Sequence, residues 1–275
     1  MNNSTPQKCR LILEALLVVT AITANAQKLP SVQKTSVYAP INVKTDGKTN
    51  EWENKFEAQN NATGLYYTMA NDGDKLYLTI QGRPGTGSPI SKMQNGGITL
   101  TFKSNDKSVK PVVFDFLIFE RNGLTDVGKK MNAADAKMDS LLGPINTQVS
   151  NALKEIGVKG VNDITDTLIS VYNEYGIKQA VQYDSKKALT CEIAIPLKYI
   201  SHLMKDGAFK YNVKLNAMKM GKVSIVMNGS PVAPGSAGEA KAAVMFSSIS
   251  ISGTGGMGDV FNDTDFSGAY ILAKK

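Results

Sequence analysis

The sequence has few of the side chains that most enzymes use for catalysis and metal binding. Its 275 residues include one histidine, one tryptophan and two cysteines. Because His202 is the only imidazole, a Ser-His-Asp or Cys-His mechanism would have a single possible base, and no G-x-S-x-G motif accompanies it. The same scarcity disfavours bis-histidine haem and histidine-rich zinc sites. The sequence leaves a carboxylate-based glycosidase open, but no pair of carboxylates stands out, and we expect a non-catalytic protein.

The first 26 residues have the pattern of a signal peptide. Lys8 and Arg10 precede an apolar run from Leu11 to about Thr23, and Ala24-Asn25-Ala26 is a small-x-small cleavage pattern. The apolar run is too short for a membrane span. We therefore expect cleavage after Ala26 and export of residues 27–275 to the periplasm, the cell surface or the medium, with no transmembrane span in the mature chain.

Removal of this leader leaves one cysteine and a moderately basic chain. The loss of Lys8, Arg10 and Glu14 lowers the net charge from +7 to +6. A single remaining cysteine, Cys191, excludes an internal disulfide and any multi-cysteine metal site. It alternates in phase with Leu189 and other apolar residues, which predicts a buried core thiol. The lysines are scattered and not interleaved with aromatic residues, so a solvated basic surface is favoured over a nucleic-acid groove.

Short alternating segments predict an all-β fold. Residues 65–70 and 76–80 alternate between apolar and other side chains on either side of a polar turn, which is typical of a hairpin. A glycine- and proline-rich stretch at 82–97 predicts a long loop. Ten or more strands at this spacing favour a single antiparallel β-sandwich domain over residues 27–275. Strands of the last third are expected at 211–217, 223–227, 242–251 and 269–273, the second of them pairing with the first.

Residues 124–163 interrupt the β pattern with a helical insertion. Apolar residues recur at spacings of three and four from Met131 to Ile156, which predicts an amphipathic stripe. Gly143-Pro144 should divide it into two helices, about 132–142 and 144–156, because glycine suits a helix end and proline a first turn. The stripe either binds a protein partner or covers the core of the sandwich, and packing on its own core is favoured.

Three short motifs and a closing segment resemble a known family. The motifs are Asp46-Gly-Lys-Thr-Asn-Glu-Trp52, the hairpin that begins its turn at Asn71-Asp72, and Glu192-Ile-Ala-Ile-Pro-Leu197, and the closing segment is Phe266 to Ala273. In this order and spacing they resemble the family 9 carbohydrate-binding modules and their relatives, which are bacterial β-sandwich domains. The resemblance covers most of the chain after residue 40 and implies an antiparallel β-sandwich that binds sugar without catalysis.

The single tryptophan has two interpretations. An exposed Trp52 could stack on a sugar ring, whereas the resemblance places it in the structure beside the turn made by Asp46 and Gly47, and we expect it to be buried. The best-known family members clamp the end of a glycan between two tryptophans. This chain has one, with Ser267 where relatives often have another. Either the ligand differs, or tyrosines substitute, or sugar binding is lost.

If tyrosines substitute, the first hairpin offers a binding face. A register that pairs Ala70 with Lys75 places Tyr66, Tyr77 and Gln81 together on the outward face. Tyrosine has a flat ring with a polar tip, and Gln81 has a donor and an acceptor, so these three are expected to contact a polysaccharide or oligosaccharide. The alternative is that the helical insertion packs on this face.

The rival to sugar binding is a structural or protein-interaction scaffold of the cell envelope. In that interpretation the sandwich has no glycan ligand, and the helical insertion or the glycine-rich loops meet a protein partner. Glycan binding separates the two hypotheses.

Two acidic turns offer oxygen ligands of the kind that calcium prefers. Asp72 and Asp74 lie in the first, and the second contains Asp259, Asn262, Asp263 and Asp265. Ordinary turn chemistry also explains both. Family 9 modules are associated with bound calcium, so the resemblance implies Ca²⁺ as a candidate cofactor, with the second turn as its expected site.

Overall fold

The computed structural model describes residues 28–85, 89–120, 123, 124, 126–133, 137–218 and 259–275, together with the backbone of 226, 227, 230 and 231. The expected signal peptide, residues 1–26, lies outside the described residues. So does the strand expected at 242–251.

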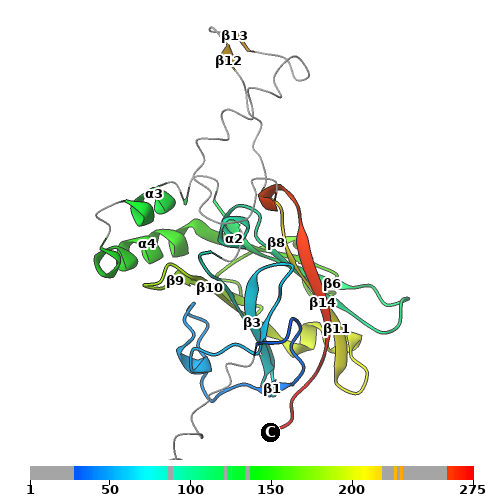
Figure 1. The fold of residues 1–275 in the computed structure, drawn as a ribbon. Coiled ribbons are helices and arrows are strands. Elements are labelled where there is room, and N and C mark those ends of the chain that lie inside the picture. The colour runs from blue at the N-terminus through cyan, green and yellow to red at the C-terminus, as the bar shows by residue number, and fades with distance from the viewer. Residues whose placement is uncertain are drawn as a thin grey trace, which may run out of the picture.

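Two six-stranded sheets make up most of the fold (Figure 1). The first sheet consists of β1 (Val37–Tyr38), β2 (Ala58–Gln59), β3 (Leu65–Asn71), β4 (Lys75–Gly82), β9 (Lys178–Tyr183) and β10 (Leu189–Pro196). Its order is β1-β3-β4-β10-β9, and β2 also pairs with β3. The second sheet consists of β5 (Ile98–Lys103), β6 (Val112–Phe119), β7 (Leu153–Lys159), β8 (Leu168–Ser170), β11 (Ala208–Leu215) and β14 (Thr264–Ile271). Its order is β14-β11-β5-β6-β7-β8.

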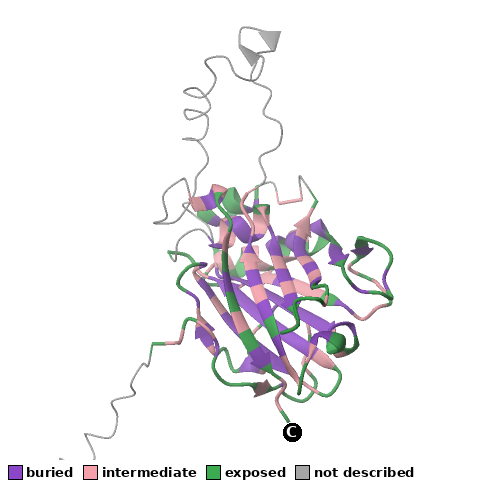
Figure 2. Cartoon of the chain, turned by 90° about the vertical axis from the view of Figure 1, so that its right-hand side faces the viewer, coloured by how far each residue is buried: buried purple, intermediate pink, exposed green. Residues whose placement is uncertain are grey.

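The two sheets enclose one apolar core. Along the second sheet, buried residues alternate with more exposed ones, as Figure 2 shows. Tyr67 of β3 and Tyr211 of β11 meet between the sheets with their hydroxyl oxygens 3.2 Å apart. Cys191 is fully buried in the same core, as predicted, and desolvation raises the pKa of its thiol. The predicted β-sandwich architecture is therefore present.

The first sheet is buried on its outer face as well. Nearly every residue of β4 and β10 is buried. The N-terminal segment, blue in Figure 1, crosses this outer face and forms a second apolar cluster with it. The buried members of this cluster are Ala39, Trp52, Ala70, Tyr77 and Ala194. The strands of the first hairpin therefore belong to the middle of three layers, between the second sheet and the N-terminal segment.

The helical insertion differs from the prediction in its boundaries. It contains α3 (Val127–Asn132) and α4 (Met138–Ala152), and α4 continues through Pro144. The expected break fails because apolar residues on both sides of Gly143-Pro144 pack on the core. Leu141 and Leu142 before it are half-buried, and Ile145 and Val149 after it are buried. This packing outweighs the hydrogen bond that proline removes. The expected helix end near 156 is also wrong, since the chain extends as β7 from Leu153 and pairs with β6.

The apolar side of α4 covers the protein's own core, as the favoured interpretation predicted. Ile145 and Val149 belong to the main apolar cluster. In Figure 1, α4 lies beside β9, the edge strand of the first sheet. The Asn146 amide donates to the Tyr183 carbonyl (2.9 Å) and accepts from the Tyr183 N–H (2.7 Å). One side chain of α4 thus satisfies backbone groups at the sheet edge, which protects that edge from other strands.

The remaining elements are short. Helix α2 (Pro89–Asn95) occupies part of the stretch 82–97 where a loop was expected, and 3-10 helices lie at Asn50–Trp52, Leu197–Tyr199, Ser201–Leu203 and Asp259–Phe261. Strands β12 (Val226–Met227) and β13 (Ser230–Pro231) pair with each other. The prediction that 223–227 pairs with β11 is therefore wrong for its described residues, because β5 and β14 flank β11. Among the described residues, no helix is long and apolar enough to cross a membrane.

Candidate functional site

The first and last sequence motifs meet at one buried carboxylate. Glu192 of β10 points outward from the first sheet and is 3% exposed. Its Oε2 accepts the backbone N–H groups of Asp46 and Gly47, each at 3.0 Å, and its Oε1 accepts the Trp52 indole N–H at 2.8 Å. Desolvation raises the pKa of Glu192 and outweighs these three hydrogen bonds, which favour the charged form. Both carboxylate oxygens accept hydrogen bonds from the turn, so Glu192 attaches the N-terminal segment to the first sheet.

Gly47 allows the turn to approach the sheet this closely. Its φ of +84° is in the left-handed region, and a Cβ on Gly47 would lie 2.8 Å from the Gln182 nitrogen of β9. The Gln182 amide also donates to the Asp46 carbonyl at 2.8 Å. A glycine is therefore required both by backbone conformation and by contact.

Trp52 is buried, as predicted, but on the outer face of the first sheet. It is 8% exposed and its ring centroid lies 6.4 Å from that of Tyr77. The Tyr77 hydroxyl donates to Asp72 at 2.7 Å. Burial raises the pKa of Asp72, but hydrogen bonds from Tyr77, Asp74 and Lys75 outweigh it and hold the pKa below its usual value. Trp52 closes a second, smaller core and does not enter the space between the sheets.

The exposed sugar-binding face expected on the first hairpin is not found. Ala70 pairs with Tyr77, and Tyr66 pairs with Gln81, a shift of two residues from the predicted register. This shift keeps Tyr66, Tyr77 and Gln81 on one face, because side chains alternate with a period of two. Tyr77 and Gln81 are nevertheless only 7% and 5% exposed. Trp52 of the N-terminal segment, and not the helical insertion, packs on Tyr77, while the Gln81 amide is bonded to Arg83 and Thr190.

A polar cleft opens at the uncovered end of this face. Its volume is about 530 Å³. The lining residues are Thr49, Asn54, Phe56, Gln81, Arg83, Pro84, Asp184, Ser185, Lys186 and Ala188. We call it the Arg83 cleft. Of the three residues expected to contact sugar, Gln81 lines it, Tyr66 lies beneath Arg83, and Tyr77 lies further along the strands under Trp52.

Arg83 is held flat at the cleft by aromatic rings and an amide. Its guanidinium carbon lies 3.8 Å from the Tyr66 ring centroid and 5.6 Å from that of Phe56. Its Nε donates to the Gln81 amide oxygen at 2.5 Å, and the Gln81 amide donates to Thr190 at 3.0 Å. Stacking and hydrogen bonding together fix the plane of the guanidinium. The ring of Tyr66 is therefore covered by a cation and is not itself a platform for a sugar.

The opposite wall is the turn between β9 and β10. The Asp184 carboxylate accepts the backbone N–H groups of Lys186 and Ala188, at 2.9 and 2.8 Å. This turn presents the exposed side chains of Ser185 and Lys186 to the cleft. The cleft therefore combines hydroxyl, amide and cationic groups, which suit recognition of a polar ligand.

Sequence reasoning missed both Glu192 and Arg83 as site residues. A signal for Glu192 was present, because it is a charged residue inside an otherwise apolar strand, and such residues are buried only when they are paired. No comparable pattern marked Arg83. Its position depends on the fold, which brings Phe56 and Tyr66 beneath it.

The carboxylates of the second acidic turn are not gathered into a metal-binding group in the described residues. No cluster of three or more His, Cys, Asp or Glu side chains with metal-binding spacing occurs in the described part of the chain. Asp263 instead accepts the Ala217 N–H at 2.7 Å and pairs with Lys214 at 3.1 Å. The buried Lys92 ammonium donates to Thr264 at 2.9 Å and attracts Asp259 and Asp263, although desolvation lowers its pKa.

The other two residues of this turn and the first acidic turn serve the fold. Asp265 accepts from Asn212, and Asn262 donates its N–H to the Asp259 carbonyl at 3.3 Å. In the first turn, Asp72 accepts the N–H groups of Asp74 and Lys75 at 2.8 and 2.7 Å. These carboxylates act as acceptors for backbone and side-chain donors of the protein itself.

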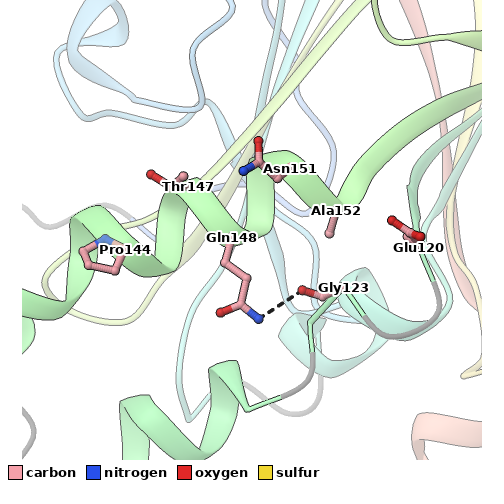
Figure 3. Close-up of a pocket in the computed structure, with 7 residues that line it drawn as sticks. All are labelled: Glu120, Gly123, Pro144, Thr147, Gln148, Asn151 and Ala152. Atoms are coloured by element: carbon pink, nitrogen blue, oxygen red, sulfur yellow. Dashed lines mark hydrogen bonds between the residues drawn. The ribbon is translucent and has the colours of Figure 1, made fainter.

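A second cavity, of about 440 Å³, lies beside α4 (Figure 3). Glu120, Gly123, Pro144, Thr147, Gln148, Asn151 and Ala152 line it. The Gln148 amide points to the Gly123 carbonyl and donates to it at 3.1 Å, while Lys130 donates to the Gln148 oxygen at 3.2 Å. Gln148 therefore ties α4 to the rest of the insertion. We take the Arg83 cleft as the stronger candidate for a ligand site.

The fold and the site define a β-sandwich protein with a polar cleft on the outer face of one sheet. Comparison with known proteins finds no family model that matches the chain and no significant match among curated proteins.

Proposed function

We propose that this protein is an exported, non-catalytic carbohydrate-binding domain of the family 9 module type, and that the glycan binds in the Arg83 cleft. The observation that carries the proposal is the cleft itself. A flat guanidinium stacked on Tyr66 lies beside the Gln81 amide, the Asn54 amide and the hydroxyls of Thr49 and Ser185. Sugars present many hydroxyl groups, and a cleft with this mixture of donors and acceptors matches them.

The motif geometry supports the same proposal. The family resemblance rested on separate short motifs, and Glu192 of one motif binds the backbone and the tryptophan of another. A physical reason for their joint occurrence strengthens the likeness. The cleft begins next to this junction, because Gln81 pairs with Thr190, two residues before Glu192.

The alternative function is a protein-interaction scaffold of the cell envelope. It is supported by exposed apolar side chains near the edge strand β8, where Leu168 is 52% and Tyr172 is 88% exposed. A scaffold of this kind predicts no glycan binding, so one experiment separates the two functions.

The test is a screen of the protein, residues 27–275, against immobilised neutral and acidic glycans. We expect binding to at least one class. The Ser185→Trp variant should abolish it, because a large side chain on the exposed rim fills the cleft without touching the core. Asn105→Trp, in the exposed β5–β6 turn of the second sheet, is the matched control and should bind as the parent does. Absence of binding to every glycan, or equal binding by Ser185→Trp, would contradict the proposal.

A further inference from the structure

We infer that one end of the sandwich docks on a membrane surface that carries anionic lipid headgroups. The docking surface contains Ile41, Ile271, Lys103 and Lys210, and we call it the Ile271 surface. It is separate from the proposed glycan site, because none of these residues lines the Arg83 cleft. The inference is carried by exposed apolar side chains that lie beside exposed lysines.

Hydrogen bonds bring β1 and the end of β14 together. Ser36, next to β1, donates its hydroxyl to the Ile271 carbonyl. The Tyr270 hydroxyl donates to the Val37 carbonyl at 3.1 Å and accepts the Val37 N–H at 3.2 Å. Ile41 follows in the turn after β1. In Figure 1 these segments lie at the lower end of the molecule, so both isoleucines belong to one end of the sandwich.

Exposed apolar side chains concentrate at this end. Five large apolar side chains of the described residues are exposed, and three of them are Tyr38, Ile41 and Ile271. Ile41 is 85% and Ile271 is 59% exposed. Ile271 points outward from the second sheet, because the preceding Tyr270 is buried in the core and side chains alternate along a strand. An apolar interface that removes these side chains from water would stabilise the bound state.

Two lysines lie next to Ile271 on the outward face of the second sheet. Ile271 of β14 pairs with Ala208 of β11, and Lys210, two residues further along β11, pairs with Lys103 of β5. Like charges directly opposite each other destabilise a sheet. Both lysines are exposed, and neither forms an ion pair within the described ranges. An anionic surface would relieve this repulsion.

The turns beside these lysines add further positive charge. The β5–β6 turn contains Lys107 and Lys110 with Asp106, and Lys205 and Asp206 precede β11. Lysines therefore outnumber aspartates around the pair of opposed lysines, and the Ile271 surface has an excess of positive charge.

Other acidic residues of this sheet leave that excess in place. On the same face, Asp115 pairs with Lys159 at 3.6 Å and Asp263 pairs with Lys214 at 3.1 Å. Asp265 accepts a hydrogen bond from a side-chain amide of β11. Further acidic residues lie in the hairpin turn of the first sheet, at Asp72 and Asp74, and in the β7–β8 loop, three strands away from β14, at Asp163 and Asp166.

Isoleucines beside lysines favour a lipid surface over a soluble polyanion. Each lysine close to an anionic membrane raises affinity about fivefold, and an acidic polysaccharide would gain from the same charges. An isoleucine contributes only where it leaves water, which the acyl boundary of a bilayer allows and a hydrated polyanion does not. Dependence of binding on both kinds of side chain therefore identifies a membrane.

The experiment measures co-sedimentation of residues 27–275 with lipid vesicles. We expect binding to vesicles of equal parts phosphatidylglycerol and phosphatidylcholine, and none to phosphatidylcholine alone. Added salt should weaken the binding, because it screens the lysines. Lys103→Gln combined with Lys210→Gln should lower the affinity more than about tenfold. The matched charge control combines Lys137→Gln with Lys154→Gln, two exposed lysines next to the ends of α4, and should bind as the parent does.

Ile271→Thr and Ile41→Thr test the apolar contribution. Threonine keeps the branched shape of isoleucine, and each variant should lower the affinity about fivefold. Leu168→Thr, an exposed residue of β8 at the opposite edge of the same sheet, is the matched control and should bind as the parent does. Melting curves show which variants are folded, and Ile41, which lies in a turn, retains the test if Ile271→Thr disturbs β14.

The inference would be overturned if the parent failed to bind the anionic vesicles, or if the Lys103 and Lys210 double variant bound them as its control does. Loss of binding in that double variant, with unchanged binding in both folded isoleucine variants, would also overturn it, because the surface would then suit a soluble polyanion. None of these results bears on the Arg83 cleft, which Ser185→Trp tests separately.

Discussion

At the scale of single residues, Glu192 is the most consequential side chain outside the main core. It receives three N–H groups from one turn of the N-terminal segment and holds that segment on the sheet. A buried carboxylate is tolerated only when its oxygens are satisfied, and here they are. These three N–H groups in turn need the carboxylate as their acceptor, because they lie in buried or partly buried positions.

Replacement of Glu192 should therefore be costly. In Glu192→Ala, the N–H groups of Asp46, Gly47 and Trp52 lose their acceptor, and each unsatisfied group costs roughly 1 to 3 kcal/mol. We expect a loss in unfolding free energy of about 3 to 5 kcal/mol, since the groups regain some water. Glu192→Gln retains one oxygen and should lose about half as much. Urea denaturation followed by circular dichroism measures both, and an Ala variant as stable as the Gln variant would exclude this role for the carboxylate.

At the scale of elements, the glycine turn determines how closely the N-terminal segment approaches β9. Three turn glycines distinguish the cost of a steric contact from the cost of a left-handed backbone conformation. Gly47 has a left-handed φ and a backbone neighbour within 3 Å of its Cβ position, Gly85 has the same backbone conformation in open space, and Gly73 has open space without a left-handed φ. The three alanine variants therefore separate steric contact from backbone strain.

The expected order of stability follows from these differences. Gly73→Ala should change the unfolding free energy by less than about 0.5 kcal/mol, and Gly85→Ala should lower it by about 1 kcal/mol. Gly47→Ala should lower it by about 2 to 4 kcal/mol, because the Gln182 backbone must also move. Thermal melting of the three variants tests this order. If Gly47→Ala and Gly85→Ala have the same melting temperature, the turn accommodates a Cβ at position 47 without the steric cost expected from the close Gln182 backbone.

The elements also show how far local patterns predict the fold. The hairpin of 65–80 was predicted correctly in its strands but not in its register. The Asp72 side chain accepts the N–H groups of Asp74 and Lys75, and this local bonding closes the turn of residues 72–75 between the paired Asn71 and Leu76. In the helical insertion, the glycine-proline signal was local too, and packing on both sides of it prevailed.

At the scale of the whole molecule, the third layer is what the sequence did not reveal. Alternation in β4 and β10 predicted one face toward the core and one face toward solvent. The side chains do point in these two directions, but those of the outward face are buried as well. The cover comes from residues 37 to 56, which have little regular structure and so no periodic signal. The cleft depends on where that cover ends, and hence on contacts between residues far apart in the chain.

The buried attachment of this layer should make stability depend on pH. The pKa of Glu192 is raised above its usual value near 4.5, so between these two values the folded protein binds more protons than the unfolded chain. The contribution of Glu192 to unfolding free energy is therefore full below about pH 4.5 and declines as pH rises through the folded pKa. Asp72 has the opposite dependence at lower pH, because its pKa is lowered and its contribution is lost on acidification.

The difference between the parent and Glu192→Gln isolates this effect, since all other titrating groups are shared. We expect the stability advantage of the parent to shrink as pH rises above about 4.5 and through the raised pKa of folded Glu192, because glutamine does not titrate. Urea denaturation at several pH values, followed by the fluorescence of Trp52 beside the substituted residue, measures that advantage. An advantage that stays constant or grows with pH would mean that the three hydrogen bonds outweigh desolvation, and that Glu192 binds the N-terminal segment more strongly in its charged form.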